Sequence, residues 1–245
     1  MSHGRARVAL MAGFLGGLLF AASLLLQQPT LAGVRCGNVA ATIVGTSGND
    51  NISGTQGPDV IAGLGGKDTL TGLGGDDVIC GGTGSDRVLG RVGDDTLLGG
   101  GGNDDIHGQR GNDLLRGGAG GDAGVGHQGN DRVVGGLGRD ELEGHRGSDI
   151  LRGQAGLDRI HGDRGDDRVF GGSGPDALCA KYCFAFGGTG SDFLSGGGGR
   201  DALSAQDDPP RGDDVILGGP DRDRSCADAG DKVRSVDTLF DCHGP

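Results

Sequence analysis

Aliphatic and polar positions recur with a period of nine residues along most of this chain, without a gap from Gly45 to Cys179. Each of the fifteen units in that stretch has Gly at its first and fourth positions and Asp at its sixth, and most have an aliphatic residue at the eighth. The unit Gly72–Cys80 is typical. The last three residues of each unit predict a short strand whose eighth side chain points inward, as at Ile52, Ile61, Leu70, Ile79, Val88 and Leu97.

The glycines predict a tight turn at the start of every unit, because glycine tolerates positive φ and close backbone approach. Two units then close one coil of eighteen residues, and coils stack at the strand spacing of roughly 4.8 Å. Alternate units fall on opposite edges, so the sixth-position aspartates form two rows. One row contains Asp50, Asp68, Asp86, Asp104, Asp122, Asp140, Asp158 and Asp176. The other contains Asp59, Asp77, Asp95, Asp113, Asp131, Asp149 and Asp167.

These two acidic rows indicate bound cations. Carboxylates stacked about 5 Å apart repel one another, and the 58 glycines add a large entropic cost to ordering the chain. A hard divalent cation neutralises the rows and accepts the backbone carbonyls of tight turns as further ligands. Calcium fits better than magnesium, which requires a small rigid octahedron and gives up water reluctantly. We therefore expect multiple Ca²⁺ ions as the cofactor.

The pattern Gly-Gly-x-Gly-x-Asp-x-aliphatic-x resembles the RTX, or haemolysin-type, calcium-binding nonapeptide repeat. The resemblance implies an all-β fold, a parallel β-roll or right-handed β-solenoid. It also implies calcium held between successive turns of one edge by sixth-position carboxylates and main-chain carbonyls. Three further units, at 187–195, 196–204 and 209–217, add Asp192, Asp201 and Asp214 to the predicted ligands. The resemblance is to short secreted actinobacterial members of the family, so we do not expect the effector domain of RTX toxins and proteases.

Two places depart from the pattern. The unit Gly218–Cys226 has Asp221 where the fourth glycine belongs and Ser225 where the aliphatic residue belongs, so Asp223 is not assigned as a ligand. Gly124 occupies the inward slot of its unit and predicts a weak coil. The second position is often not glycine, which leaves the turn intact.

Residues 1–32 are typical of a secretory signal peptide. Arg5 and Arg7 precede an apolar run, and small residues precede the expected cleavage site. A transmembrane anchor is the alternative, because Val8–Leu26 is nearly long enough to span a bilayer. Interior glycines and Pro29 favour cleavage, so we expect a secreted, extracellular protein with no membrane span in the mature chain.

The remaining chain is expected to form three segments. Residues 33–44 form an N-terminal cap, and residues 45–217 form the calcium-binding roll, with loops at 180–186 and 205–208 where the period is interrupted. Residues 218–245 contain the degenerate unit and a C-terminal cap. Caps are expected because the open ends of a solenoid expose unpaired strand edges.

Six cysteines in an exported chain indicate three disulfides. Fifteen pairings are possible, and the sequence alone does not select one. Spacing favours Cys226–Cys242, which bracket the tail, and Cys179–Cys183, which bracket a short excursion. Cys36–Cys80 remains by default and is the weakest pairing, since two coils separate its units and the Cα atoms must come within about 7 Å.

The charge of the chain bears on its partners. Cleavage removes two Arg and no acid, so the mature net charge is 20 − 34 = −14. A protein this acidic is not expected to bind nucleic acid or anionic lipid. The predicted partners are calcium ions and a cell-surface or matrix component that the sequence does not identify.

No catalytic motif is present: the sequence contains neither a His-Glu-x-x-His helix nor a nucleophile elbow. His127 and His145 lie eighteen residues apart and would stack on one edge, where zinc or copper could bind. The sequence shows no third ligand, so we interpret both as solvated surface residues.

These observations predict a secreted calcium-ion-binding repeat protein that folds on calcium binding and has a structural or adhesive role outside the cell. It is not expected to be an enzyme. One alternative is a polysaccharide-modifying β-solenoid enzyme. Another is a partner-binding module that uses Tyr182, Phe184 and Phe186 of the 180–186 loop.

Overall fold

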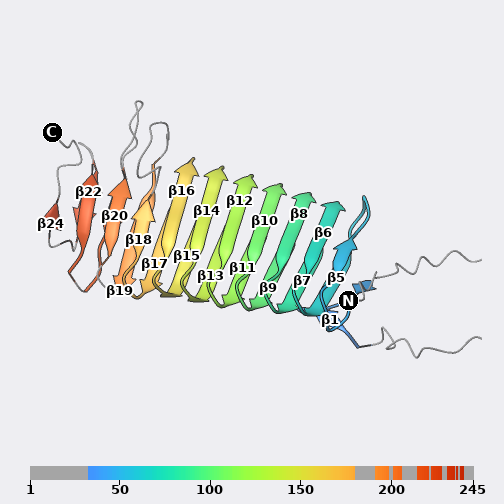
Figure 1. The fold of residues 1–245 in the computed structure, drawn as a ribbon. Helices are drawn as coiled ribbons and strands as arrows, with labels where there is room; N and C mark the ends of the chain where they lie inside the picture. The colour runs from blue at the N-terminus through green and yellow to red at the C-terminus, as the bar shows by residue number, and fades with distance from the viewer. Residues whose placement is uncertain are drawn as a thin grey trace, which may run out of the picture.

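The computed structural model describes residues 33–179, 191–198, 201–205, 214–220, 222–227, 231–234, 236 and 238–239. Within these ranges every regular element is a strand, and the strands form a parallel β-solenoid whose coils stack into a rod (Figure 1). The all-β fold class predicted from the nine-residue period is therefore confirmed. The expected signal peptide at 1–32 and the expected loop at 180–186 lie outside the described residues.

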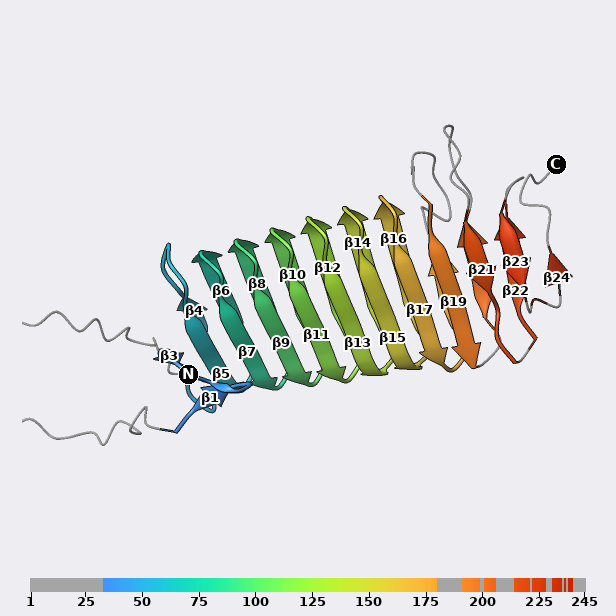
Figure 2. The same ribbon diagram turned by 180° about the vertical axis from the view of Figure 1, so that it is seen from behind.

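Two sheets of eleven strands each form the opposite sides of the rod, and Figure 2 shows them from behind. The odd sheet contains β3 (Ile43–Val44), β5 (Val60–Gly65), β7 (Val78–Thr83), β9 (Thr96–Gly101), β11 (Leu114–Ala119), β13 (Arg132–Gly138), β15 (Ile150–Gly156), β17 (Arg168–Ser173), β19 (Phe193–Gly198), β21 (Val215–Leu217) and β23 (Lys232–Arg234). The even sheet contains β4 (Asn51–Ser53), β6 (Thr69–Gly74), β8 (Arg87–Val92), β10 (Asp105–Arg110), β12 (Ala123–Gln128), β14 (Glu141–Arg146), β16 (Arg159–Arg164), β18 (Ala177–Cys179), β20 (Ala202–Ala205), β22 (Arg224–Ala227) and β24 (Thr238–Leu239).

The register repeats every eighteen residues, so each position of a unit stacks on the same position one coil away. Leu97 pairs with Leu115 in the odd sheet, for example. The spacing lengthens to 25 residues between Asp167 and Asp192 and to 22 between Asp192 and Asp214. The two interruptions therefore lengthen the chain between paired strands, but the strands keep the same register in both sheets.

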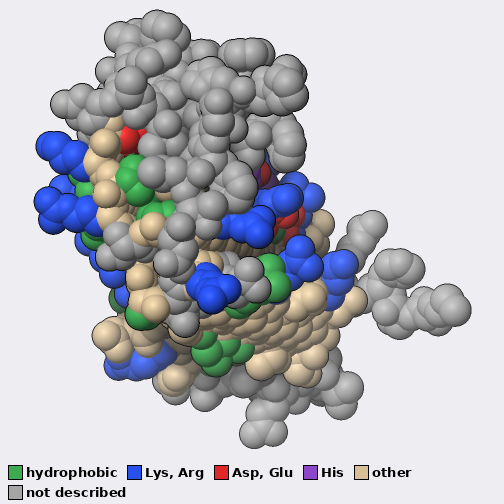
Figure 3. Space-filling view, turned by 90° about the vertical axis from the view of Figure 1, so that its left-hand side faces the viewer, with side chains coloured by type: hydrophobic (Ala, Val, Ile, Leu, Met, Phe, Trp, Pro, Cys, Tyr) green, Lys and Arg blue, Asp and Glu red, His purple; other side chains and the backbone are tan. Residues whose placement is uncertain are grey.

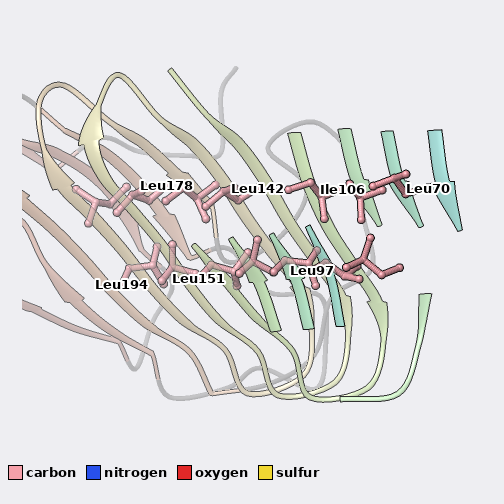
Figure 4. Close-up of a cluster of buried hydrophobic side chains, with 14 of the residues drawn as sticks. Leu70, Leu97, Ile106, Leu142, Leu151, Leu178 and Leu194 are labelled. Carbon is pink, nitrogen blue, oxygen red and sulfur yellow. The ribbon is translucent and has the colours of Figure 1, made fainter. Parts of the chain in front are cut away.

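The core consists of the eighth-position side chains, which meet between the sheets in two columns (Figure 4). Leu70, Ile106, Leu142 and Leu178 come from the even sheet, and Leu97, Leu151 and Leu194 come from the odd sheet. All of these side chains are at most 1% exposed. The prediction that the eighth side chain points inward is correct, and it follows from strand pleating, which turns alternate residues to opposite faces.

Gly124 predicts a weak coil, but neighbouring side chains fill the inward space that its missing side chain leaves. A Cβ atom built on Gly124 would lie 2.8 Å from Cγ1 of Val133 and 3.3 Å from Cδ2 of Leu142. The two side chains thus occupy the space that an inward aliphatic residue would otherwise take. β12 keeps its pairing with β10 and β14 through this position.

Most residues at the second position of the unit have positive φ, in the left-handed region of backbone space, and Thr46 and Thr55 are exceptions. Positive φ strains the backbone of a residue that is not glycine. Arg91, at a φ of 93°, and His127, at 81°, are examples at this position. The two sheets differ at this position. The odd sheet places Gly100 and Gly118 there, at φ of 116° and 120°, whereas most even-sheet units have a side chain.

Both sheets continue past Leu217 through β22, β23 and β24, so the degenerate unit adds a coil. Ser225 stands in the inward slot of that coil and is 2% exposed. At the other end, β1 (Arg35–Cys36) and β2 (Val39–Ala40) form an antiparallel hairpin ahead of the first coil.

The N-terminal hairpin is tied to the odd sheet by a disulfide between Cys36 and Cys80, whose Cα atoms lie 5.5 Å apart. This pairing, the weakest of the three on spacing, is confirmed. It forms because β1 folds back to contact β5 and β7, which brings Cys36 next to Cys80. The side chains of the other two predicted pairs, Cys179–Cys183 and Cys226–Cys242, lie outside the described residues.

Candidate metal centre

Each sixth-position aspartate stands at the end of a tight turn, directly before the strand of its unit. All eighteen aspartates predicted as ligands are buried, with at most 8% of the residue exposed. The strand starts are fixed by backbone hydrogen bonds such as that from the N–H of Asp105 to the carbonyl of Asp86, at 2.8 Å. An end-on view accordingly shows few acidic side chains, with Lys and Arg on the outer flanks (Figure 3).

One oxygen of each carboxylate joins the aspartates into continuous ladders. Oδ1 accepts a hydrogen bond from the backbone N–H of the aspartate one coil earlier, as Asp104 does from Asp86 at 2.8 Å. The same bond recurs in both rows at 2.7–3.0 Å. The structure therefore brings the predicted ligands together as two rows, one along each edge.

The second carboxylate oxygen is the unusual feature of these rows. In the middle of the roll Oδ2 is buried and has no hydrogen-bond donor. This holds for Asp68, Asp77, Asp86, Asp95, Asp104, Asp113, Asp122, Asp131, Asp140, Asp149, Asp158, Asp167, Asp176 and Asp223. A buried anionic oxygen without a donor is costly, and native proteins contain few of them. A repeated set of such atoms indicates a missing positive partner.

The first-position glycine keeps open the space beside each of these oxygens. A Cβ atom on Gly81 would lie 2.5 Å from Oδ2 of Asp86 and 2.7 Å from the carbonyl oxygen of Gly99, one coil further on. The same arrangement recurs at Gly171, where the distances to Asp176 and Gly196 are 2.5 and 2.6 Å. Carboxylate and main-chain carbonyl oxygens thus face the same small space.

These donors fit a hard cation. Among the described residues, no group of three or more His, Cys, Asp or Glu side chains converges on one point. A cation held here would therefore take main-chain carbonyls together with the aspartates, an all-oxygen set that suits calcium. The sixth-position aspartates and the first-position glycine carbonyls would hold it, and the ion would supply the charge that Oδ2 lacks.

Burial raises the pKa of the carboxyl groups from Asp68 to Asp176 in the two rows when no cation is bound. Desolvation is the main cause, and neighbouring aspartates of the same row add to it. The pKa rises to about 6 for Asp104, to about 7 for Asp113 and to about 8 for Asp167. Ionising these groups therefore costs more free energy in the folded chain than in water, and at neutral pH Asp167 remains mostly protonated.

In the first aspartate of each row, Oδ2 does have hydrogen-bond donors. Oδ2 of Asp50 accepts hydrogen bonds from the backbone N–H and the hydroxyl of Thr46, at 2.5 and 3.0 Å. Thr55 makes the same pair of bonds to Asp59, at 2.6 and 3.0 Å. A threonine at the second position thus supplies the donors that the middle of the row lacks, and it caps the N-terminal end of each ladder.

Two aspartates beyond the predicted set extend the rows. Asp223, which the degenerate unit left unassigned, is fully buried and accepts from the N–H of Asp201 at 3.0 Å. Asp231 accepts from the N–H of Asp214 at 3.3 Å. The spacing from Asp214 to Asp231 is 17 residues instead of eighteen, which hides it from a strict nine-residue count. The signal was present in Val233, an aliphatic residue two positions later.

Three histidines of the even sheet, His107, His127 and His145, form a cluster of hydrogen bonds and stacked rings. Nδ1 of His107 lies 3.1 Å from Nε2 of His127, and the rings of His127 and His145 stack at 5.1 Å. Both nitrogens of His145 meet carboxylates, Glu143 at 3.2 Å and Asp163 at 3.1 Å. These hydrogen bonds raise the pKa of His145 to about 10, whereas burial lowers that of His127.

The interpretation of His127 and His145 as solvated surface residues leaves out these contacts, although both residues are partly exposed. They stack on one edge as expected, but their ring nitrogens are engaged in hydrogen bonds with neighbouring side chains. Their nitrogens do not converge with a third ligand among the described residues.

The fold and the rows define the class of this molecule, a parallel β-solenoid of nonapeptide repeats with a row of aspartates along each edge. The chain belongs to the RTX calcium-binding nonapeptide repeat family. Its family model matches residues 44–79, 80–115, 89–124, 116–151, 143–178, 184–208 and 211–231. No curated protein sequence was found to match. Among the described residues there is no helix long and apolar enough to cross a membrane.

Proposed function

We propose that this chain is a secreted calcium-binding protein that folds when calcium fills its two aspartate rows. The observation that carries this proposal is the series of buried Oδ2 atoms without donors beside open glycine turns. In plain water each of these carboxylates must either remain protonated or stay charged without a partner. Calcium removes both penalties, because its binding free energy becomes folding free energy.

The proposed role is structural or adhesive, outside the cell, and does not involve catalysis. Residues 1–32 support export, since they are typical of a signal peptide. Extracellular calcium modules bind at about 10⁻⁴–10⁻³ M, so export to a calcium-rich medium would trigger folding. The predicted ligands are the eighteen sixth-position aspartates, joined by Asp223 on the geometry of its carboxylate.

Far-UV circular dichroism during a calcium titration tests this proposal. The expected result is a change from a disordered to a β-rich spectrum between about 10⁻⁴ and 10⁻³ M calcium, with magnesium much less effective. Native mass spectrometry at the end of the titration counts the bound ions. A spectrum that is β-rich in EGTA and unmoved up to about 10 mM calcium would falsify calcium-coupled folding.

A further inference from the structure

The odd sheet has an outer face without acidic residues. None of its described strands, from β3 to β23, contains Asp or Glu, although the whole chain has 34 acids and a net charge of −12. The exposed side chains Arg116, Arg132, Arg152 and Arg168 stand in the middle of this face. We call these four residues, with the strands β11–β17 that carry them, the arginine face.

The arginine face has no carboxylate partner for its charge among the described residues. In the even sheet, Arg87 approaches Asp105 at 3.5 Å and Arg159 approaches Glu141 at 3.8 Å. Across the described residues, none of the four arginines of the odd sheet lies within ion-pair distance of a carboxylate. A same-sign strip on a low-dielectric wall concentrates its field and attracts ligands of the opposite charge.

The four arginines are spaced regularly along the axis of the rod. Arg116 and Arg152 both pair with Val134, one from each side, and so stand two coils apart. Arg132 and Arg168 both pair with Ile150 in the same way. Each of four successive coils therefore presents one arginine, alternately in two columns, at steps of about 4.8 Å.

A furrow of about 550 Å³ runs beside these arginines. Arg116, Arg132 and Arg152 line it together with the glycines Gly118 and Gly136, whose missing side chains leave the surface hollow. At one end of the face, the guanidinium of Arg152 lies 4.6 Å from the centre of the Phe170 ring, and Phe193 packs against that ring. The furrow is thus cationic along its length and flanked by apolar surface.

We propose that the arginine face binds a linear acidic polysaccharide, with its uronate carboxylates on successive arginines and its chain along the axis. A linear ligand follows from the stacking, because each position repeats from coil to coil. Carboxylates follow from the arginine forks, which bind them with two parallel hydrogen bonds. Calcium bound in the two rows neutralises the surrounding aspartates, so the protein does not repel the acidic polymer at long range.

The surface favours a sugar polymer over a single-stranded nucleic acid. Grooves that bind single strands place aromatic rings beneath successive bases. Here the furrow is floored by glycine at Gly118 and Gly136, and the aromatic side chains Phe170 and Phe193 lie toward one end of the face. A polymer with one anionic group per ring and no bases to stack suits this surface better.

Calorimetric titration of the calcium-loaded protein with a short oligogalacturonate, too short to gel with calcium, tests the proposal. The variant R116Q/R132Q/R152Q removes three arginines of the face. The control R110Q/R146Q/R164Q removes the same charge from third positions of the even sheet. We expect the control to bind like the parent protein and the face variant to bind about tenfold more weakly or worse.

The inference rests on the folded roll and hence on the proposed function, so circular dichroism is recorded on each sample. A calcium-loaded parent protein that is unfolded contradicts the proposed function, whereas a folded parent protein that does not bind the oligogalacturonate contradicts only this inference. Equal binding by both variants, or equally tight binding of oligothymidylate, overturns the proposal. A second readout needs no variant: the oligogalacturonate should protect Arg116, Arg132 and Arg152 of the parent protein from phenylglyoxal, as read by mass spectrometry.

Discussion

Asp104→Asn should affect the calcium-free and calcium-loaded forms of the protein in opposite directions. Asp104 lies in the middle of its row, is 3% exposed, and has one carboxylate oxygen without a donor. Asn preserves the shape of the side chain and the acceptor for the N–H of Asp86, at 2.8 Å in the native chain. The substitution removes the negative charge alone, so its effect reports what that charge does in each form.

The magnitudes follow from the pKa of the buried carboxyl. Without calcium, burial raises the pKa of Asp104 from 3.8 to about 6, and two pKa units correspond to about 3 kcal/mol. This penalty on the fold is absent below pH 4, grows as the pH rises through 6, and is complete at pH 8. Asp104→Asn should therefore stabilise the calcium-free fold by up to about 3 kcal/mol at pH 8. With calcium, loss of a buried charge partner should cost on the order of 3 kcal/mol.

Urea unfolding followed by circular dichroism at pH 8 measures both quantities. Saturating calcium gives the loaded form, and EGTA with an osmolyte such as trimethylamine oxide brings the calcium-free chain into the measurable range. Glu141→Gln is the matched control, because it removes a charge from a half-exposed side chain of the even sheet. A stability in calcium that is unchanged or increased by Asp104→Asn would show that this carboxylate is not a cation ligand.

Four other expectations address the rows, the turns, the disulfide and the histidine cluster. In EGTA, β-content should rise as the pH falls from 8 to 5, because the raised pKa values of the buried aspartates favour their protonated form in the fold. In calcium, β-content should instead fall over the same pH range, because protons displace the ion. The same pH dependence of the circular dichroism signal with and without calcium would contradict the cation assignment. Gly81→Ala should lower the stability of the loaded form by about 2 kcal/mol through overpacking, whereas Gly101→Ala, with no neighbour within 4 Å of the added carbon, should leave the urea midpoint nearly unchanged. Replacing Cys36 and Cys80 by Ser should cost about 4 kcal/mol, because the disulfide links residues 44 positions apart; an unchanged urea midpoint would exclude a stabilising role. His145 should remain protonated at pH 8 in NMR spectra, since its pKa is raised to about 10 by two carboxylates, and a titration near 6.5 would disprove the hydrogen-bonded cluster.

The sequence predicts most of this fold because one repeat sets the turns, the inward side chains and the stacking of the coils. The eighth-position residues such as Leu97 are inward, as strand pleating requires, and the eighteen-residue coil follows from placing two units on opposite edges. The aspartate rows are also predictable, since stacking like positions brings like side chains together. The spacing of the cysteines left Cys36–Cys80 as the weakest pairing, because the fold of β1 back onto β5 and β7 is not encoded in the repeat.

The remaining features depend on contacts that no single unit encodes. The bonds from Thr46 to Asp50 need the turn geometry to place a hydroxyl beside Oδ2. Asp231 joins its row only because the tail omits one residue without breaking the sheet. The cluster around His145 combines positions from neighbouring coils, which are eighteen residues apart in the sequence.

The difference between the two sheets at the second position means that the sequence period and the structural period are not the same. Deleting a single unit of nine residues would leave every glycine and aspartate in phase, yet each downstream strand would change sheets. Deleting residues 153–161, for example, would move Arg168 to the face that carries His145, and Asp163 would interrupt the acid-free face. Deleting two adjacent units would shorten the rod by one coil and preserve both faces. A roll of this kind can therefore vary its length without losing its surfaces only in steps of a whole coil.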